Sequence, residues 1–413
     1  MPKVADPKLA DKGRLAYEWA SKHMPILAKS IDRLKDERPL HGIKVAFCLH
    51  VTKETSMLVM GAKRLGADVS LCAANPLSTQ DDVAAFLASQ GIDVYAWRDE
   101  SMDEYYSCIR SVLANRPDTI TDDGSDMHVL YHKEFKGKSN YKPIGGTEET
   151  TTGVIRLRAL ASEGKLAYPV IAVNNAYTKH LFDNRYGTGQ STIDGILRAA
   201  GILLAGKVVV VAGYGWVGKG IASRARGMGA RVIVTEVDPI KALEAHMDGF
   251  AVMPMDEAAR YADVVVTATG QINVVRQEHI KAMRDGVILA NAGHFDVEID
   301  VRWLESNAME RRVVRDNLEE YRIDGKSIYL IGKGRIANLV AAEGHPPEVM
   351  ALSFANQLLS IVYVVKNHAK MENKVYDVPE EIDRQVAINA LEAMGIRIDE
   401  PTREQLEYAK RWL

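Results

Sequence analysis

The feature that most constrains this chain is a glycine-rich turn between an apolar strand and a helix. Residues 207–212 read KVVVVA, and the next six, Gly213 to Gly218, have the spacing G-x-G-x-x-G. In that spacing the first glycine permits a tight turn, the second lets backbone approach a pyrophosphate, and the third lets the helix pack closely on the strand. Glu236 lies 21 residues after Gly215, at the end of the next predicted strand, where a carboxylate binds both ribose hydroxyls and repels a 2′-phosphate. The pattern predicts a Rossmann domain that binds NAD rather than NADP.

Short apolar strands alternate with helical segments in two blocks of the chain, which predicts an α/β protein with two doubly wound parallel sheets. The predicted strands are 44–49, 68–73, 93–97, 119–121 and 169–176 in the first block, and 207–212, 231–238, 263–270 and 286–293 in the second. The polar stretch 131–150 is predicted to be a loop or lid, and 346–365 an apolar helix. We expect a substrate-binding domain over 1–185, a Rossmann NAD domain over 186–343, a return to the first domain over 344–375, and a C-terminal tail over 376–413.

Composition limits the possible partners. The chain has 413 residues and a net charge of −3, so no global charge attracts nucleic acid or an anionic membrane. The three cysteines form no C-x-x-C pair, which argues against a disulfide framework or a thiolate metal site. No leader and no apolar run of about 18 residues is apparent, so we expect a cytoplasmic protein without a metal or a membrane span.

Polar residues gather where the first block's strands end. His50 and Thr52 follow the first strand, Asn75 the second and Asp122-Asp123-Gly124 the fourth. Glu148 to Gly153, Lys179 and Phe182-Asp183-Asn184 precede the cofactor domain, while Thr269-Gly270 and Asn291 to His294 end strands of the second block. Singly, each has an ordinary structural explanation: a core histidine, a turn residue or a helix N-terminus. Together they predict a ligand cleft between the two domains.

Several of these stretches resemble one family over nearly the full chain. They are LHVTKET (49–55), NPLSTQD (75–81), DDGSD (122–126), EETTTG (148–153), TKHLFDNRYG (178–187) and GHFDVEID (293–300). With the GYGWVG turn, they make the chain similar to the S-adenosyl-L-homocysteine hydrolases, in the short form of archaea and some thermophilic bacteria. The resemblance implies tightly bound NAD, a nucleoside thioether substrate and a homotetramer.

The resemblance also implies a reaction without net redox change. The ribose 3′-hydroxyl is oxidised to a ketone, which acidifies the C4′ proton. Loss of that proton expels homocysteine from C5′, water adds to the enone, and the ketone is reduced again. The products are adenosine and L-homocysteine, formed reversibly.

By motif position, the resemblance assigns catalytic roles. Lys179 and Asp183 would serve 3′-oxidation and C4′ deprotonation. His50 and Asp123 would transfer protons at C5′. Glu149 would hold the ribose hydroxyls, and Asn184 would orient the nicotinamide.

The resemblance further assigns binding residues. Glu54 would accept a hydrogen bond from the purine 6-amino group. The other expected substrate contacts are Thr52, Thr55, Gln80, Asp123, Glu149, Lys179, Asp183, His294 and His345. The expected NAD contacts are Thr150, Thr151, Thr152, Asn184, Gly213, Gly215, Trp216, Val217, Gly218, Glu236, Thr269, Gly270, Asn291, Ala292, Gly293, His294, Asn338 and His345.

The chain departs from the better-known members at four places. Trp216 stands where they have Asp, Thr188 where they have Cys, and Lys333 where they have an acidic residue. The chain also ends in YAKRWL, whereas longer members end in a KPDHYRY-type tail that reaches a neighbouring subunit's NAD.

Three alternatives stay open. Hydrolysis of S-inosyl-L-homocysteine is disfavoured by Glu54, because a carboxylate facing inosine O6 is repulsive. A 2-hydroxyacid dehydrogenase shares the Rossmann half but lacks EETTTG. An inert nucleotide-binding relative is disfavoured because His50, Lys179 and Asp183 are all present.

Overall fold

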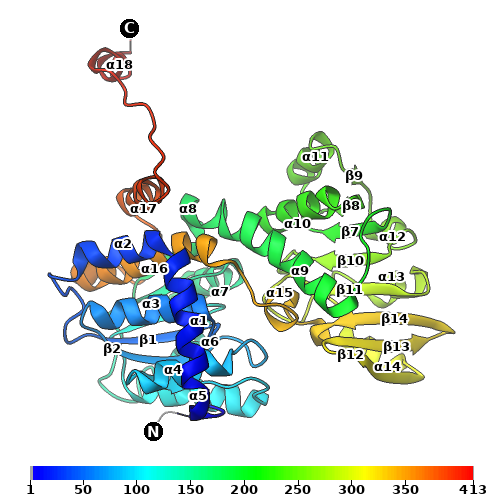
Figure 1. Cartoon of the computed structure of the whole chain (residues 1–413), viewed down its shortest axis with the longest axis horizontal. Helices are drawn as coiled ribbons and strands as arrows, with labels where there is room; N and C mark the ends of the chain where they lie inside the picture. The colour runs from blue at the N-terminus through cyan, green and yellow to red at the C-terminus, as the bar shows by residue number, and fades with distance from the viewer. Residues whose placement is uncertain (1–2, 413) are drawn as a thin grey trace.

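The buried apolar runs of the sequence form the central strands of two separate sheets. In the computed structural model, which describes residues 3–412, the two sheets lie in two units side by side (Figure 1). The first sheet is parallel throughout, in the order β15-β6-β5-β4-β1-β2-β3. Its strands are β1 (Lys44–Leu49), β2 (Asp68–Ala73), β3 (Asp93–Tyr95), β4 (Thr119–Asp122), β5 (Gly145–Glu148), β6 (Val170–Ala172) and β15 (Val375–Asp377).

The second sheet carries the glycine-rich turn and has the order β12-β13-β14-β11-β10-β7-β8-β9. It is parallel from β14 to β9 and antiparallel over β12, β13 and β14. Its strands are β7 (Val208–Ala212), β8 (Arg231–Thr235), β9 (Ala251–Val252), β10 (Val264–Thr267), β11 (Val287–Asn291), β12 (Glu310–Arg315), β13 (Leu318–Ile323) and β14 (Lys326–Ile331). The predicted α/β class with two doubly wound parallel sheets is confirmed, and an antiparallel extension is added to the second.

Helices cover both sheets. Those of the first unit are α1 (Ala10–His23), α2 (Pro25–Leu34), α3 (Lys53–Arg64), α4 (Asp81–Ser89), α5 (Met102–Ala114), α6 (Asp126–Leu130), α7 (Thr151–Ser162), α8 (Tyr177–His180), α16 (Pro347–Asn367) and α17 (Glu380–Ala393). Those of the second are α9 (Thr188–Ala200), α10 (Trp216–Gly227), α11 (Pro239–Met247), α12 (Met255–Ala258), α13 (Gln277–Ala282), α14 (Val301–Asn307) and α15 (Ala337–Val340). A last short helix, α18 (Arg403–Tyr408), stands away from the body (Figure 1).

Each sheet has a switch point that opens toward the other unit. In the first sheet β1 lies between β2 and β4, so the loops after β1 and β4 leave the same edge in opposite directions. In the second sheet the loops after β7 and β10 are related in the same way. Ligands bind at such crevices because the loops diverge there. The topology therefore explains why polar residues follow these four strands.

The predicted loop over 131–150 is wrong in part. Residues Tyr131–Phe135 form a helical turn, and Gly145–Glu148 form strand β5 in the middle of the sheet. Glycines are needed there, because a Cβ on Gly145 would lie 2.4 Å from Val364 and one on Gly146 2.5 Å from His128. The strands at 310–331 are a second difference, because the sequence analysis does not predict them.

Helix α16 is long and apolar enough to cross a membrane by length and composition alone. In the structure it is a core helix of the first unit, packed against α2, α3, α17 and β5. The predicted domain boundaries stay a prediction. Part of the predicted tail joins the first unit, because β15 pairs with β6 and α17 packs on α2 and α16.

Candidate active site

A cavity of 1460 Å³ lies between the units, at the carboxyl ends of both sheets. Most of the predicted site residues line it, including residues that directly follow β1, β4, β5, β7, β8, β10 and β11 along the chain. The predicted residues that line it are His50, Thr52, Glu54, Thr55, Asp123, Glu149, Thr150, Thr151, Thr152, Lys179, Asp183, Asn184, Gly213, Gly215, Trp216, Val217, Glu236, Thr269, Gly270, Ala292, Gly293, His294, Asn338 and His345. The fold thus brings together residues that are up to 295 positions apart in the sequence, from His50 to His345.

Three predicted residues do not line the cavity. Gln80 accepts a hydrogen bond from the backbone N–H of Lys53 at 3.0 Å, which fixes the start of α3. Gly218 lies under the glycine turn, where a Cβ would be 1.9 Å from the carbonyl oxygen of Gly213. The Asn291 amide donates to the carbonyls of Gly293, Phe295 and Gly334, at distances of 2.8–3.2 Å. These three residues shape the walls of the site.

Lys179 is the centre of a buried polar cluster. Its ammonium donates to Asn184 Oδ1 at 2.9 Å and lies 3.5 Å from Glu149 Oε1 and 3.6 Å from Asp183 Oδ1. Asn174 also accepts from this ammonium, at 3.4 Å, and from the Asn184 amide, at 3.2 Å. A cation and two carboxylates therefore meet away from bulk water, where each controls the ionisation of the others.

The acids of this cluster titrate in opposite directions. Burial raises the pKa of Glu149 to about 7, against the attraction of Lys179. Burial alone would also raise the pKa of Asp183, but Lys179 and His345 together hold it below its usual value. Burial disfavours the Lys179 ammonium, yet Asp183 and Glu149 raise its pKa above the usual value. At neutral pH the site thus holds an ammonium beside a firmly ionised Asp183 and a Glu149 near its titration point.

His50 and Asp123 face each other across the first switch point. His50 Nε2 lies 3.6 Å from Asp123 Oδ2, and its Nδ1 is 2.7 Å from the Ser78 hydroxyl. Burial lowers the pKa of His50 to about 4, so its imidazole is neutral at pH 7 and available as a base. His294, from the second unit, places Nδ1 3.6 Å from Asp123 Oδ1. The ligand-type atoms of these three residues lie within 4.8 Å of one another, a spacing that a metal ion or a set of proton-transfer groups can share.

Side chains that the sequence analysis missed support the predicted ones. Ser353 and Gln357 of α16 donate hydrogen bonds to the two oxygens of Glu149. Both belong to a polar stripe in this apolar helix, Ser353, Asn356, Gln357 and Ser360, which is fully buried. The spacing i, i+3, i+4, i+7 places the stripe on one helix face. Polar residues at helical spacing within this apolar segment are the sequence signal that points to these supporting side chains.

The glycine turn leaves room for a dinucleotide. Gly213 has φ +97°, and its Cβ position is 2.8 Å from the Ala268 carbonyl oxygen, so a side chain is excluded. The Cβ position of Gly215, which lines the cavity, has no atom within 4 Å. Backbone N–H groups at the start of α10 face this space, which suits a pyrophosphate.

Unsatisfied polar atoms support the same use of the cavity. Thr152 Oγ1 and Asn338 Oδ1 are buried and lack a hydrogen-bond partner within residues 3–412. Glu298 instead is satisfied, because it accepts from the backbone of Thr269 and Gly270 and fixes the loop after β10. Since buried polar atoms are normally paired, the two free atoms fit a ligand with its own polar groups. The residues present therefore fit NAD.

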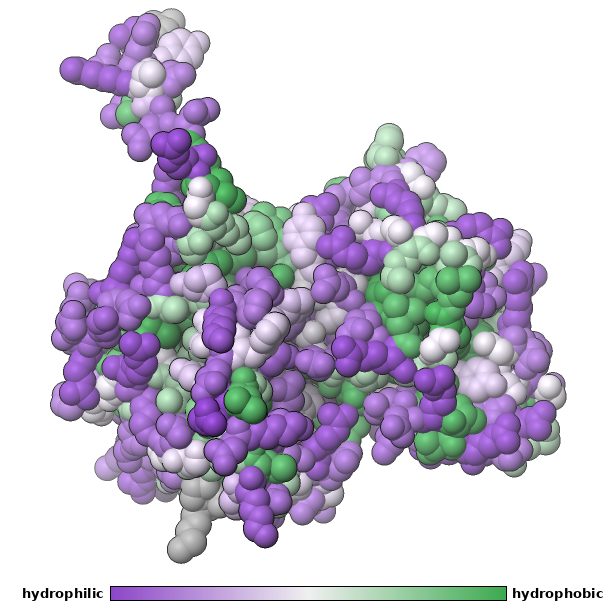
Figure 2. Space-filling model, in the orientation of Figure 1, coloured by the Kyte–Doolittle hydropathy of each residue, from purple (hydrophilic) through white to green (hydrophobic). Residues whose placement is uncertain are grey.

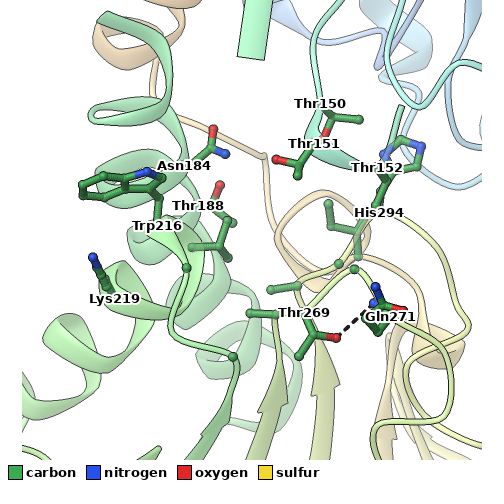
Figure 3. Close-up of a pocket in the computed structure, with 18 of the residues that line it drawn as sticks. Thr150, Thr151, Thr152, Asn184, Thr188, Trp216, Lys219, Thr269, Gln271 and His294 are labelled. Carbon is green, nitrogen blue, oxygen red and sulfur yellow. Dashed lines mark hydrogen bonds between the residues drawn. The ribbon is translucent and has the colours of Figure 1, made fainter. Parts of the chain in front are cut away.

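Threonines and aromatic groups surround this part of the cavity (Figure 3). Thr150, Thr151, Thr152 and His294 lie on one side, Asn184, Thr188 and Trp216 on a second, and Thr269 and Gln271 on a third (Figure 3). Thr188 stays polar and contacts the site, since its hydroxyl is 3.0 Å from His345 Nε2. Lys333, by contrast, is exposed and does not line the cavity.

Comparison with known proteins gives the same family in both units. The model described as S-adenosyl-L-homocysteine hydrolase matches residues 2–143, and its NAD binding domain model matches residues 184–344. Adenosylhomocysteinases from Sulfurisphaera tokodaii and Aquifex aeolicus are 58% and 57% identical over 411 residues, covering 99% of this chain and 98% of each relative. The protein named S-inosyl-L-homocysteine hydrolase from Methanopyrus kandleri is 56% identical, covering 99% of this chain and 97% of that protein.

Proposed function

The chain belongs to the S-adenosyl-L-homocysteine hydrolase family, and from this premise we propose how its own residues divide the reaction. It is an NAD-dependent enzyme that reversibly hydrolyses S-adenosyl-L-homocysteine to adenosine and L-homocysteine. The observation that supports the assignment of steps is the buried contact of Lys179 with Asp183 and Glu149.

The chemistry that NAD supplies when bound is reversible hydride acceptance at the ribose C3′. The ionised Asp183 takes the proton of the 3′-hydroxyl as the hydride leaves C3′, while the Lys179 ammonium, 3.6 Å from Asp183, donates a hydrogen bond to the 3′-oxygen. Asp183, whose low pKa lets it release that first proton, then takes the C4′ proton, and the Lys179 ammonium stabilises the negative charge that develops on the 3′-oxygen. Glu149 binds the ribose hydroxyls. Hydrogen bonds from Ser353 and Gln357 hold its carboxylate in place for this role.

His50 and Asp123 serve the C5′ end of the reaction. A neutral His50 can take a proton from the attacking water, and the nearby Asp123 stabilises the resulting imidazolium. Homocysteine leaves as a thiolate, which the imidazolium formed on water addition can then protonate. His294 reaches this pair from the second unit, so the two halves of the site depend on both units being in contact.

The purine end favours an amino group over an oxo group. Glu54 lines the cavity and is 1% exposed, and its Oε1 accepts no hydrogen bond of good geometry in the described part of the chain, although the Lys53 ammonium lies 3.2 Å away. A carboxylate in this position accepts from a 6-amino donor and repels a 6-oxo acceptor. S-inosyl-L-homocysteine is therefore the second candidate substrate, favoured only by the name of one relative.

Parallel assays of the two nucleosides test the substrate assignment. We expect kcat/KM to be higher for S-adenosyl-L-homocysteine, with stoichiometric NAD in the purified protein and no net NADH formed. Equal or faster turnover of the inosine compound would overturn the assignment. Accumulating NADH with a hydroxyacid would instead indicate a dehydrogenase.

We further propose that the enzyme is a cytoplasmic homotetramer of the methyl cycle. The three cysteines are free and buried, as expected in a reducing compartment. Large hydrophobic side chains are exposed on the second unit, among them Leu203 at 74%, and Figure 2 shows a hydrophobic area there. Such surface is typical of subunit contacts. Light scattering of the purified holoenzyme measures the assembly directly, and a monomeric mass would contradict the proposal.

A further inference from the structure

Lys53 and Glu54 are neighbours in sequence but face two different cavities. Glu54 lines the large cavity, whereas Lys53 lines a second cavity of 480 Å³ together with Arg198 and Glu343. Successive residues of a helix point about 100° apart, and these two are the first residues of α3. Lys53 is thus part of the wall between the substrate site and the smaller cavity.

The Lys53 ammonium is shared by two carboxylates. Its Nζ lies 3.2 Å from Glu54 Oε1 and 3.1 Å from Glu343 Oε2. Glu343 belongs to the segment that leads from the second unit back into α16, and its other oxygen is 3.4 Å from the guanidinium of Arg198. Because Lys53 is only 13% exposed and Glu54 2% exposed in their side chains, water screens their contact weakly.

The charge of Glu54 decides which purine it can bind. An ionised carboxylate only accepts hydrogen bonds, and so pairs with a 6-amino group. A protonated carboxyl can also donate, and so pairs with a 6-oxo group. Burial raises the pKa of Glu54, and the charged group that opposes this is Lys53. The charged groups that act on Lys53 are Glu54 and Glu343, while His345, farther along the connecting segment, faces Asp183 at 3.4 Å.

We propose that Lys53 is a specificity-determining residue: held between Glu343 and Glu54, its ammonium keeps the Glu54 carboxylate charged and so makes the site select a 6-amino purine over a 6-oxo purine. The proposal rests on the proposed contact between Glu54 and the purine. Glu343 is the positioning residue, because its Oε2, 3.1 Å from the Lys53 ammonium, fixes the long lysine side chain at the wall between the two cavities. Selectivity for the purine base therefore depends on Glu343, which belongs to the segment that joins the two units.

The test uses the NAD-loaded enzyme and its Lys53→Met variant, with S-adenosyl- and S-inosyl-L-homocysteine as the probes. At a pH below the pKa of a carboxyl group, raising that pKa by one unit lowers the ionised fraction about tenfold. We expect the adenosyl preference in kcat/KM to fall at least about tenfold, mainly through KM. As pH is lowered, KM should rise for the adenosyl compound and fall for the inosyl compound. Lys53→Arg should keep the preference, and Lys63→Met, a lysine on the same helix that bonds backbone carbonyls elsewhere, should not change it.

Parallel losses for both substrates, with one common pH profile, would show that Lys53 is merely structural and would overturn the proposal. Glu54→Gln separates this failure from a failure of the premise. If Glu54→Gln keeps the full preference, the purine does not contact Glu54 and the premise is wrong. If Glu54→Gln loses the preference while Lys53→Met keeps it, the purine placement stands and the role of Lys53 is refuted.

Discussion

At the residue scale, the active site depends on acids that burial alone would keep neutral. Asp183 stays ionised because Lys179 and His345 lie against it, whereas Glu149 titrates near neutrality although it contacts the same lysine. The difference has a structural cause, since His345 adds a second contact only to Asp183. Removing one member of such a cluster changes the protonation of the rest.

Replacing Lys179 tests this cluster most directly. Lys179→Ala removes the ammonium that stabilises charge on the 3′-oxygen, so we expect kcat to fall about 10²–10⁴-fold or more. NAD should stay bound, because the glycine turn is untouched. Kinetics and the NAD released on denaturation measure the two effects, with the exposed Lys165→Ala as control. Near-normal turnover would refute the role of Lys179.

The pKa of Glu149, raised to about 7 by burial, predicts a pH dependence. Ionised Glu149 accepts charge-assisted hydrogen bonds from the ribose hydroxyls, and these weaken as it gains a proton when pH falls through about 7. KM for the substrate should therefore rise up to about tenfold per pH unit below that point. Glu149→Gln should have a high KM without this pH dependence. If the dependence persists in the variant, another group causes it, and Asp122, whose pKa burial also raises to about 7, would be the first to examine.

Glu236 tests the cofactor preference. Its carboxylate accepts from the backbone N–H groups of Tyr214 and Val237 at 2.7 Å, which places it at the mouth of the glycine turn. Glu236→Ala should weaken NAD binding about 10–100-fold, the value of a hydrogen bond to a charged group, and relax discrimination against NADP. Titration with both dinucleotides measures this, with the exposed Glu257→Ala as control. Unchanged NAD affinity would contradict the placement of the ribose.

At the element scale, strands were predictable where burial on both faces requires an apolar run, as in β1, β2, β7 and β11. Strand β5 reads GGTE and lacks that signal, because close neighbours such as Val364 and His128 leave room only for glycine. The hairpins of β12 to β14 were not predicted because charged residues interrupt the apolar pattern. The exposed β12, for example, reads ERRVVR. Apolar periodicity therefore identifies the centre of each sheet better than its edge.

Gly215 and Gly218 of the glycine turn have different surroundings, so we expect their alanine variants to behave differently. Gly215→Ala places a methyl group in the open cavity, so NAD content should fall while the NAD-free chain keeps its thermal stability. Gly218→Ala places a Cβ 1.9 Å from the Gly213 carbonyl oxygen. That overlap should cost about 1–3 kcal/mol of unfolding free energy with or without NAD. Calorimetry of both variants separates the effects, and equal losses of stability would contradict the distinction.

At the scale of the whole molecule, most of the residues that the sequence predicts for the site line one cavity, because parallel strands end at one edge. His50 and Asp123 are 73 positions apart but follow neighbouring strands, β1 and β4. The support from α16 was not predictable in the same way, since Ser353 lies 204 positions after Glu149 and only tertiary packing joins them. Local patterns thus identify the reacting groups, while long-range packing supplies the groups that hold them.

The C-terminal arm provides the last prediction. Residues 395–412 are exposed, and α18 stands away from the body (Figure 1), so the arm does not reach the cavity of its own chain. Deleting 395–413 should therefore leave kcat and NAD content unchanged, whereas deletion from Met371 onward should lower thermal stability by removing β15 and α17. Light scattering of the same samples separates a loss of assembly from a loss of cofactor. NAD release by the shorter deletion would instead show that the C-terminal arm completes a neighbouring subunit's site.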